Sequence, residues 1–231
     1  MFSRPLNVLA VIPARGGSKG IPRKNLVEFR GKPLIQHTLD VAAASRSVTQ
    51  VLISTDDDEI YDYCLAQGFV MPYRRPSELG QDTTPMIDVV LDALTWFEAD
   101  TGTSPDYVLL LQPTSPMRAV EDVDGLIEWL SLNGGESVAS VHQVREHPME
   151  CVRMQADGTW NYLVEPPPSA YGRQEYPDDF YFINGAMYAA TPDFLRRSRQ
   201  FVGSGPTTAF YPMHRTRGLD IDYPSDLVSF Q

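Results

Sequence analysis

Residues 6–25 read LNVLAVIPARGGSKGIPRKN. Residues 6–12 of this stretch are short and apolar, which is typical of a strand that is covered on both faces of a sheet. A proline and a glycine-rich, basic loop follow directly. In open α/β sheets, ligands bind beyond the carboxyl ends of the strands. The stretch therefore predicts a buried strand with a binding site at its end.

The segments that follow alternate between helix and strand patterns. Helices are expected at residues 33–44, 57–67, 85–99 and 120–132, and strands at 50–54, 69–72 and 106–111. Such alternation implies βαβ units and a parallel sheet with helices on both faces. We therefore predict a Rossmann-like α/β fold with a mostly parallel, doubly wound sheet.

This rhythm breaks after about residue 140. Strands are expected at 138–144, 152–155, 160–164, 180–190 and 208–213, a helix at 192–199 and a final helical turn at 224–230. Asp157-Gly158 predicts a hairpin turn between two of these strands. We expect a single domain over residues 1–231, with a small inserted subdomain at about 142–181 that carries a partner interface.

Charge and cysteine content exclude several classes of protein. The chain has 231 residues and a formal net charge of −11, which argues against nucleic acid as a partner because phosphate binding depends on Lys and Arg. It contains no apolar run of about 18 residues, so no membrane association is expected. Cys64 and Cys151 show no disulfide or metal spacing, and we expect reduced thiols in a cytoplasmic protein.

The loop at residues 13–25 is the strongest candidate for a site. Its glycines let backbone N–H groups approach phosphate oxygens closely. Arg15 can bind two oxygens at once, while Lys19 and Lys24 act as point charges. The spacing matches neither the Walker loop nor the dinucleotide fingerprint. A phosphate site is predicted, and the alternative is a flexible surface loop with solvated charges.

Asp220 and Asp222 are candidate metal ligands. They alternate about Ile221, so in a strand both carboxylates face one side. Two carboxylates on one face repel unless a cation or a shared proton intervenes. Hard oxygen ligands completed by phosphate oxygens suit Mg²⁺, and an exposed acidic edge is the alternative. The acidic run at residues 56–58 is instead expected to cap a helix.

Seven blocks of sequence stand out in a particular order. They are ARGGSKG (14–20) with Lys24-Asn25, STD (54–56), RPSEL (75–79) with Asp82-Thr83, LQPTSPMR (111–118), Arg173-Gln174, NGA (184–186) and DID (220–222). In this order they resemble the N-acylneuraminate cytidylyltransferases, also called CMP-sialic acid synthetases, over nearly the whole chain. The resemblance implies that CTP and an acidic nine-carbon 2-keto sugar give a CMP-sugar and pyrophosphate. It also implies a homodimer in which the insert reaches across to its twin.

The resemblance assigns roles to individual residues. The residues that match its nucleotide-binding segments are Arg15, Gly16, Gly17, Ser18, Lys19, Lys24, Asn25, Arg75, Asp82 and Thr83. Of these, Arg75 and the Asp82-Thr83 pair match the part that reads the cytosine, and the alternative for Arg75 is a helix-edge salt bridge. The expected catalytic residues are Arg15, Lys19, Lys24, Asp220 and Asp222, and the last two are the expected Mg²⁺ ligands.

Three further residues are expected to bind the sugar. Gln112 follows an apolar strand and matches a position near the sugar, although its amide can also cap the following loop. Arg173 can hold the sugar carboxylate with both arms of its guanidinium. Tyr181 lies in an aromatic stretch that supports the sugar or, alternatively, forms subdomain core. Arg118 suits a structural role as well as a substrate role, and none of the four histidines is assigned.

One position departs from the resemblance. Family members often carry a lysine after the His147-Pro148 pair, where this chain has Glu150 in the aligned position. A carboxylate there disfavours an acidic sugar nearby. Either this side chain points elsewhere, or the substrate is a legionaminic- or pseudaminic-type diamino sugar. Other readings are a transferase for a Kdo-type acid or a sugar phosphate, a different nucleotide base, and a non-catalytic sugar-nucleotide sensor.

Overall fold

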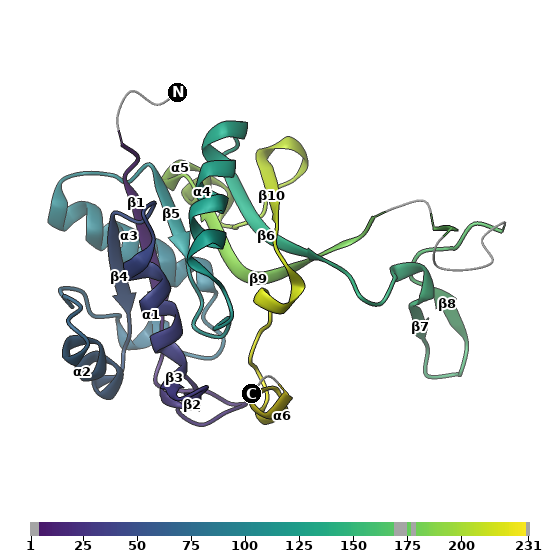
Figure 1. Ribbon diagram of the computed structural model, residues 1–231, viewed down its shortest axis with the longest axis horizontal. Coiled ribbons are helices and arrows are strands. Elements are labelled where there is room, and N and C mark those ends of the chain that lie inside the picture. The colour runs from purple at the N-terminus through teal and green to yellow at the C-terminus, as the bar shows by residue number, and fades with distance from the viewer. Residues whose placement is uncertain (1–4, 169–174, 177–178, 230–231) are drawn as a thin grey trace.

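The computed structural model describes residues 5–168, 175–176 and 179–229, and Figure 1 shows its elements. The helices are α1 (Leu34–Ala44), α2 (Asp58–Ala66), α3 (Met86–Thr101), α4 (Val120–Asn133), α5 (Pro192–Ser198) and α6 (Pro224–Ser229). The main strands are β1 (Val8–Pro13), β4 (Gln50–Ser54), β5 (Tyr107–Leu110), β6 (Ser137–Gln143), β9 (Tyr181–Ala190) and β10 (Thr208–Pro212). Two short pairs are β2 (Glu28–Phe29) with β3 (Lys32–Pro33), and β7 (Val152–Met154) with β8 (Trp160–Tyr162). Single 3₁₀ turns are η1 (Lys24–Leu26), η2 (Ser77–Gly80), η3 (Pro148–Glu150), η5 (Gly205–Thr207) and η6 (Arg215–Arg217).

Six strands form one mixed sheet in the order β10-β6-β9-β5-β1-β4. β1 pairs in parallel with β4 on one side and with β5 on the other, and β10 pairs in parallel with β6. β9 runs antiparallel to both of its neighbours. The prediction of a mostly parallel sheet is confirmed, and β9 is the reversed strand within it.

Helices cover both faces of the sheet. Successive side chains of β1 point to opposite faces, and both sets are apolar, so each face needs a covering layer. Val8, Ala10 and Ile12 are fully buried in a cluster with residues of α1, α2 and α4. Leu9 and Val11 are fully buried in a second cluster with residues of α3 and α5. Figure 1 shows these helix layers on either side of the sheet. The predicted doubly wound α/β architecture is therefore confirmed.

The brief strand predicted at residues 69–72 is wrong. The backbone N–H of Phe69 donates to the carbonyl of Cys64 at 3.1 Å, so this residue still closes the end of α2. Gly68 precedes it with a φ of +87°, which turns the chain away from the helix. Residues 69–72 then run without strand pairing towards Arg75.

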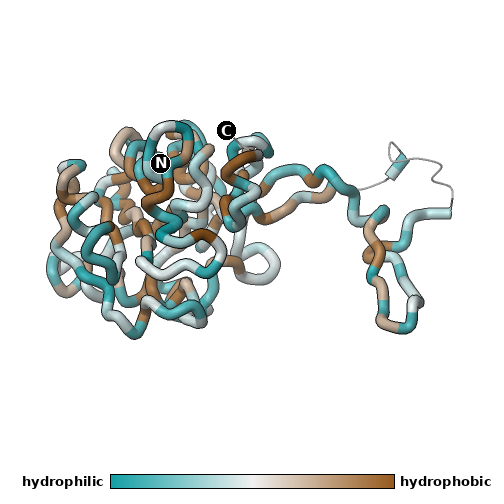
Figure 2. Tube along the Cα trace, turned by 90° about the horizontal axis from the view of Figure 1, so that it is seen from below, coloured by the Kyte–Doolittle hydropathy of each residue, from teal (hydrophilic) through white to brown (hydrophobic). Residues whose placement is uncertain are grey.

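β6 and β9 extend beyond the body of the protein as a two-stranded arm. Their register pairs Val141 with Ile183 and Gln143 with Tyr181. The β7–β8 hairpin lies at the far end of the arm, and Figures 1 and 2 show it reaching away from the body in perpendicular views. The arm occupies the residues of the expected insert. A role for it at a dimer interface stays a prediction.

Two further sequence features can be placed. Cys64 is buried and Cys151 is half-buried, and neither forms a disulfide among the described residues. Burial raises the pKa of Cys64 to about 11. Within the described ranges, no helix is both long enough and apolar enough to cross a membrane.

Candidate active site

The glycine-rich loop borders a cavity of about 260 Å³, which we call the loop cavity. Its lining residues are Pro13, Arg15, Gly17, Ser18, Lys24, Asn25, Arg75, Met86, Gln112, Pro113, Thr114, Asp220 and Asp222. The cavity opens beyond the carboxyl ends of β1 and β5. The chain passes from β1 to β4 on one side of β1 and then returns to β5 on its other side. This reversal is the switch point at which α/β sheets bind ligands.

Lys24 joins the amino-terminal loop to the carboxyl-terminal aspartates. Its Nζ donates to Asp222 Oδ1 at 2.8 Å and to the carbonyl oxygen of Ile221 at 3.1 Å. The N–H of Ile221 donates to the carbonyl of Thr114 at 2.8 Å, and its side chain is fully buried beside Ile21. The basic loop near the amino terminus and the acidic segment near the carboxyl terminus therefore meet at this cavity.

Asp220 and Asp222 do not lie in a strand, which corrects the expectation from their alternation. The segment has no strand pairing, and the N–H of Asp222 donates to the Asp226 carboxylate at 2.9 Å. Both aspartates nevertheless line the loop cavity, while Ile221 points into the core. Burial raises the pKa of Asp220, and repulsion from the carboxylate of Asp222 raises it further.

These two carboxylates have the chemistry that Mg²⁺ requires. Among the described residues, no group of three or more His, Cys, Asp and Glu side chains gathers as metal ligands. Mg²⁺ is often held by one or two carboxylates together with substrate phosphates and water. The pair therefore fits a magnesium ion that arrives with a polyphosphate.

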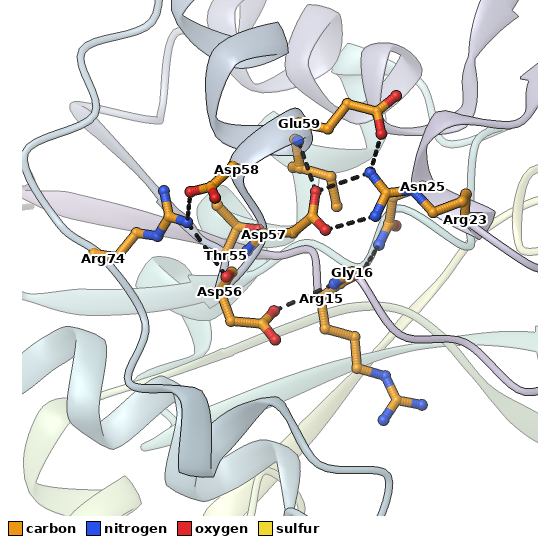
Figure 3. Close-up of polar contacts among 11 residues, drawn as sticks. Arg15, Gly16, Arg23, Asn25, Thr55, Asp56, Asp57, Asp58, Glu59 and Arg74 are labelled. Carbon is orange, nitrogen blue, oxygen red and sulfur yellow. Dashed lines mark hydrogen bonds and ion pairs between the residues drawn. The ribbon is translucent and has the colours of Figure 1, made fainter.

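Asp57 holds the base of the loop in place (Figure 3). It caps α2 by accepting the N–H of Ile60 at 3.0 Å, and it accepts both guanidinium arms of Arg23 at 2.6 and 3.0 Å. Burial would raise the pKa of Asp57, but the Arg23 and Ile60 hydrogen bonds outweigh it and leave this pKa below its ordinary value. Arg23 adopts a φ of +55°, an uncommon conformation for a residue other than glycine. Asp57 thus acts as the predicted helix cap and also anchors the loop.

Asp82 holds two of the loop cations. Its carboxylate oxygens lie 2.6 Å from Arg15 Nη1 and 3.0 Å from Lys19 Nζ. Asn25 Nδ2 donates to the carbonyl of Arg15 at 2.9 Å, which orients this part of the loop. A polyphosphate would compete with Asp82 for the same cations. Lys19 and Asp82 do not line the loop cavity. The neighbouring Thr83 is exposed and does not line it either.

Arg75 is buried and contacts the end of β4. Its Nε donates to Ser54 Oγ at 2.9 Å and its Nη2 to the Ser54 carbonyl at 2.6 Å. Burial lowers its pKa. Among the described residues it makes these hydrogen bonds and no ion pair, so the alternative of a helix-edge salt bridge is wrong. It lines the loop cavity, where the predicted nucleotide-reading role would place it.

Gln112 lines two adjoining cavities. The second cavity measures about 490 Å³, and we call it the arm cavity. Its lining residues are Gln112, His142, Phe182, Ile183, Asn184, Gly185, Tyr188, Gly218, Leu219, Asp220 and Asp226. Arg118 is buried and donates to the Gln112 carbonyl at 3.3 Å and to Thr38 Oγ1 at 2.8 Å. Arg118 therefore has the structural role, and Gln112 lines both cavities.

Two residues predicted to bind the sugar are not found with Gln112. Tyr181 lies on the other face of β9, where it lines an apolar hollow with Trp129 and Phe210. Arg173 lies outside the described residues. Sequence reasoning missed His142 and Asn184, which line the arm cavity. Asn184 belongs to the NGA block at 184–186, which carried the resemblance but received no role, whereas nothing in the sequence singled out His142.

The sequence is similar to a protein family and to two characterised relatives. A family model described as Cytidylyltransferase matches residues 9–156. The chain is 35% identical over 224 residues to a CMP-N,N'-diacetyllegionaminic acid synthase of Legionella pneumophila, covering 96% of this chain and 93% of that protein. It is 31% identical over 222 residues to an N-acylneuraminate cytidylyltransferase of Streptococcus agalactiae, covering 95% of this chain but about half (51%) of that protein.

The fold is shared with a solved structure of CMP:2-keto-3-deoxy-manno-octonic acid synthetase in complex with CTP. The TM-score is 0.70 at 21% identity, and the match covers 96% of both chains. At this identity the likeness concerns the fold.

Proposed function

Because this chain belongs to the cytidylyltransferase family, we propose that it transfers CMP from CTP to the anomeric hydroxyl of a nonulosonic acid and releases pyrophosphate. It is an enzyme of the nucleotidyltransferase class. The observation that carries the proposal is the contact of Lys24 with Asp222, which closes one cavity between the basic loop and the acidic pair. A polyphosphate with a divalent cation has the charges that such a cavity matches.

The residues of the loop cavity act mainly by positioning and by charge neutralisation. Arg15, Ser18 and Lys24 surround the place for the triphosphate, and Lys19 lies next to it on the exposed side. Asp220 and Asp222 would hold Mg²⁺, which supplies positive charge to the phosphate oxygens. The sugar hydroxyl attacks the α-phosphorus as the pyrophosphate leaves.

The arm cavity is the place for the sugar acid. It shares Gln112 and Asp220 with the loop cavity, so a sugar held there would lie beside the reacting phosphate. Glu150 is exposed on the arm and lines neither cavity. We infer a legionaminic-type diamino sugar as the substrate, since the Legionella pneumophila synthase covers almost the whole chain.

We also propose that two copies form a cytoplasmic homodimer through the arm. Met154 and Trp160 on the β7–β8 hairpin are 68% and 53% exposed. Large apolar side chains gathered at this exposure are typical of a surface that a partner covers. Light scattering on the intact chain should give twice the monomer mass. A monomer at micromolar concentration would contradict this part of the proposal.

The decisive assay combines CTP, Mg²⁺ and a panel of acids, with mass detection of the product. The panel holds N,N'-diacetyllegionaminic, pseudaminic and N-acetylneuraminic acids, together with the eight-carbon acid named for the structural relative. We expect a CMP-sugar with the legionaminic acid and none after chelation of Mg²⁺. A product with the eight-carbon acid alone would support the alternative substrate. CTP binding without pyrophosphate release would support a sensor.

A further inference from the structure

The arm cavity contains polar groups to which the proposed function gives no task. This inference rests on that function, because it concerns the sugar acid that the cavity would hold. A volume of about 490 Å³ is within the range of small-molecule pockets, about 300–1,000 Å³. Phe182 and Tyr188 supply apolar walls, while His142 and Asn184 supply polar atoms.

Asn184 presents a donor that no described residue satisfies. Its side chain is 4% exposed. Its Oδ1 accepts from Ser140 Oγ at 2.6 Å and from the N–H of Ala186 at 3.1 Å. Since a backbone N–H can only donate, these bonds define which end of the amide is the oxygen. The Nδ2 end is buried and has no partner among the described residues, and such a group is costly unless a ligand or water pairs with it.

A second unpaired atom belongs to His142, which lines the same cavity. It lies opposite Phe182 in the β6–β9 register, and the two rings are tilted with centroids 5.5 Å apart. Its Nδ1 is buried and has no partner among the described residues. Burial, together with the positive charge of Arg215, lowers its pKa, so the ring is mainly neutral at pH 7. A neutral imidazole offers one nitrogen that accepts a hydrogen bond.

We infer that His142 and Asn184 together bind an acylamino group of the sugar acid. Asn184 Nδ2 donates to the acyl carbonyl oxygen, and His142 Nδ1 accepts the amide N–H. An acylamino group carries its acceptor and its donor on two separate atoms, whereas a hydroxyl group must meet both partners from one oxygen. The pair therefore selects N-acylated sugar acids over their hydroxyl analogues.

Gly218 lies directly beside the donor of Asn184. A Cβ atom at this position would lie 2.4 Å from Asn184 Nδ2, which is closer than real Cβ contacts come. The backbone φ of Gly218 is −95°, so alanine is compatible with the backbone itself. Gly218→Ala should therefore cover or displace the donor without straining the chain.

The test compares kcat/KM for an acid with an acetamido group and for its analogue with a hydroxyl at the same carbon. We expect the wild type to prefer the acetamido acid by about tenfold or more, the effect of pairing a buried polar group. His142→Phe keeps a ring of similar size and should lose most of this preference. His142→Asn places an amide near the Nδ1 position and should retain much of it. His214→Phe changes an exposed histidine outside the cavity and should leave the preference unchanged.

Gly218→Ala provides an independent arm, because it acts on Asn184 and not on His142. It should lower kcat/KM for the acetamido acid by about tenfold and change that for the hydroxyl analogue much less. Circular dichroism and Tm values verify that each variant is folded. If the preference survives in both His142→Phe and Gly218→Ala, the inference is overturned while the proposed function stands. If the wild type turns over no nonulosonic acid, both are overturned.

Discussion

Gly20→Ala should separate the two halves of the candidate active site. A Cβ atom at this position would lie 2.4 Å from the carbonyl oxygen of Asp222, and real Cβ contacts are essentially never below 3.0 Å. The loop and the acidic segment must therefore move apart by at least 0.6 Å. The obstacle is backbone, so no side-chain rotation can relieve it. Because Lys24 belongs to the loop and Asp222 to the acidic segment, this displacement should lengthen the contact between them.

Gly20→Ala should lower both the catalytic rate and the stability. Misplacement of about 1 Å costs on the order of 100-fold in rate, so we expect kcat/KM to fall by roughly 10- to 100-fold. Overpacking costs about 1–3 kcal/mol, and each kcal/mol lowers Tm by about 2–4 °C in a chain of this size. The assay is pyrophosphate release from CTP with the preferred acid, over a series of Mg²⁺ concentrations.

Gly135→Ala is the matched control. Its Cβ atom would approach no atom outside its immediate chain neighbours closer than 3.4 Å, and the residue lies between α4 and β6, away from both cavities. It should leave kcat/KM and the Mg²⁺ dependence unchanged. If folded Gly20→Ala has wild-type kcat/KM and Mg²⁺ dependence, the close approach of loop and acidic segment does not serve catalysis, and the reasoning is refuted.

Three other predictions concern stability and thiol chemistry. Asp57→Ala removes a helix cap and should lower the free energy of unfolding, measured in urea, by about 1–2 kcal/mol. Because the pKa of Asp57 is below its ordinary value of 3.8, this difference from the wild type should be constant at pH 5–8 and should disappear as the pH falls below about 4. A gap that widens in acid would contradict this. Arg118→Met leaves the carbonyl groups of Gln112 and Ala186 without this donor and should cost about 2 kcal/mol or more. Arg46→Met, at an exposed position, should change stability by less than about 0.5 kcal/mol. Thiol titration at pH 8 should label Cys151 first and Cys64 only in denaturant, since burial raises the pKa of Cys64 to about 11. Equal labelling rates of the two cysteines in the native protein would refute this prediction.

Local pattern was sufficient for the central elements of the fold. The apolar run that becomes β1 is buried on both faces, so it needs no alternation to be recognised. The glycines and cations after it mark a binding loop, because few other tasks need both within ten residues. These features depend on neighbouring residues in the sequence, and prediction from sequence works best for them.

The placement of Tyr181 shows why the remainder of the site could not be predicted. Residues 180–190 are apolar in both phases of the strand, so the sequence does not indicate which phase faces a cavity. Which phase of β9 faces the cavity is decided by its pairing with β6, and the register of this pairing shifts between Ala139 and Val141. That shift depends on tertiary contacts, and it places Phe182 and Asn184 towards the arm cavity and Tyr181 away from it.

The acidic pair shows the same limit in another form. Alternation about a buried Ile221 predicted the common direction of Asp220 and Asp222, but the strand expected there does not form. One backbone hydrogen bond to Thr114 and the cap from Asp226 hold the segment instead. Both partners come from tertiary structure or from the following turn, which alternation alone does not reveal.

The most direct test of the central claim is a crystal structure of the protein with CTP and Mn²⁺, in which an anomalous difference map locates the manganese. We predict a Mn²⁺ peak bound by Asp220 and Asp222, with the triphosphate lying between that ion and the side chains of Arg15 and Lys24. A nucleotide bound away from the glycine-rich loop, or a metal ion bound away from both aspartates, would contradict it.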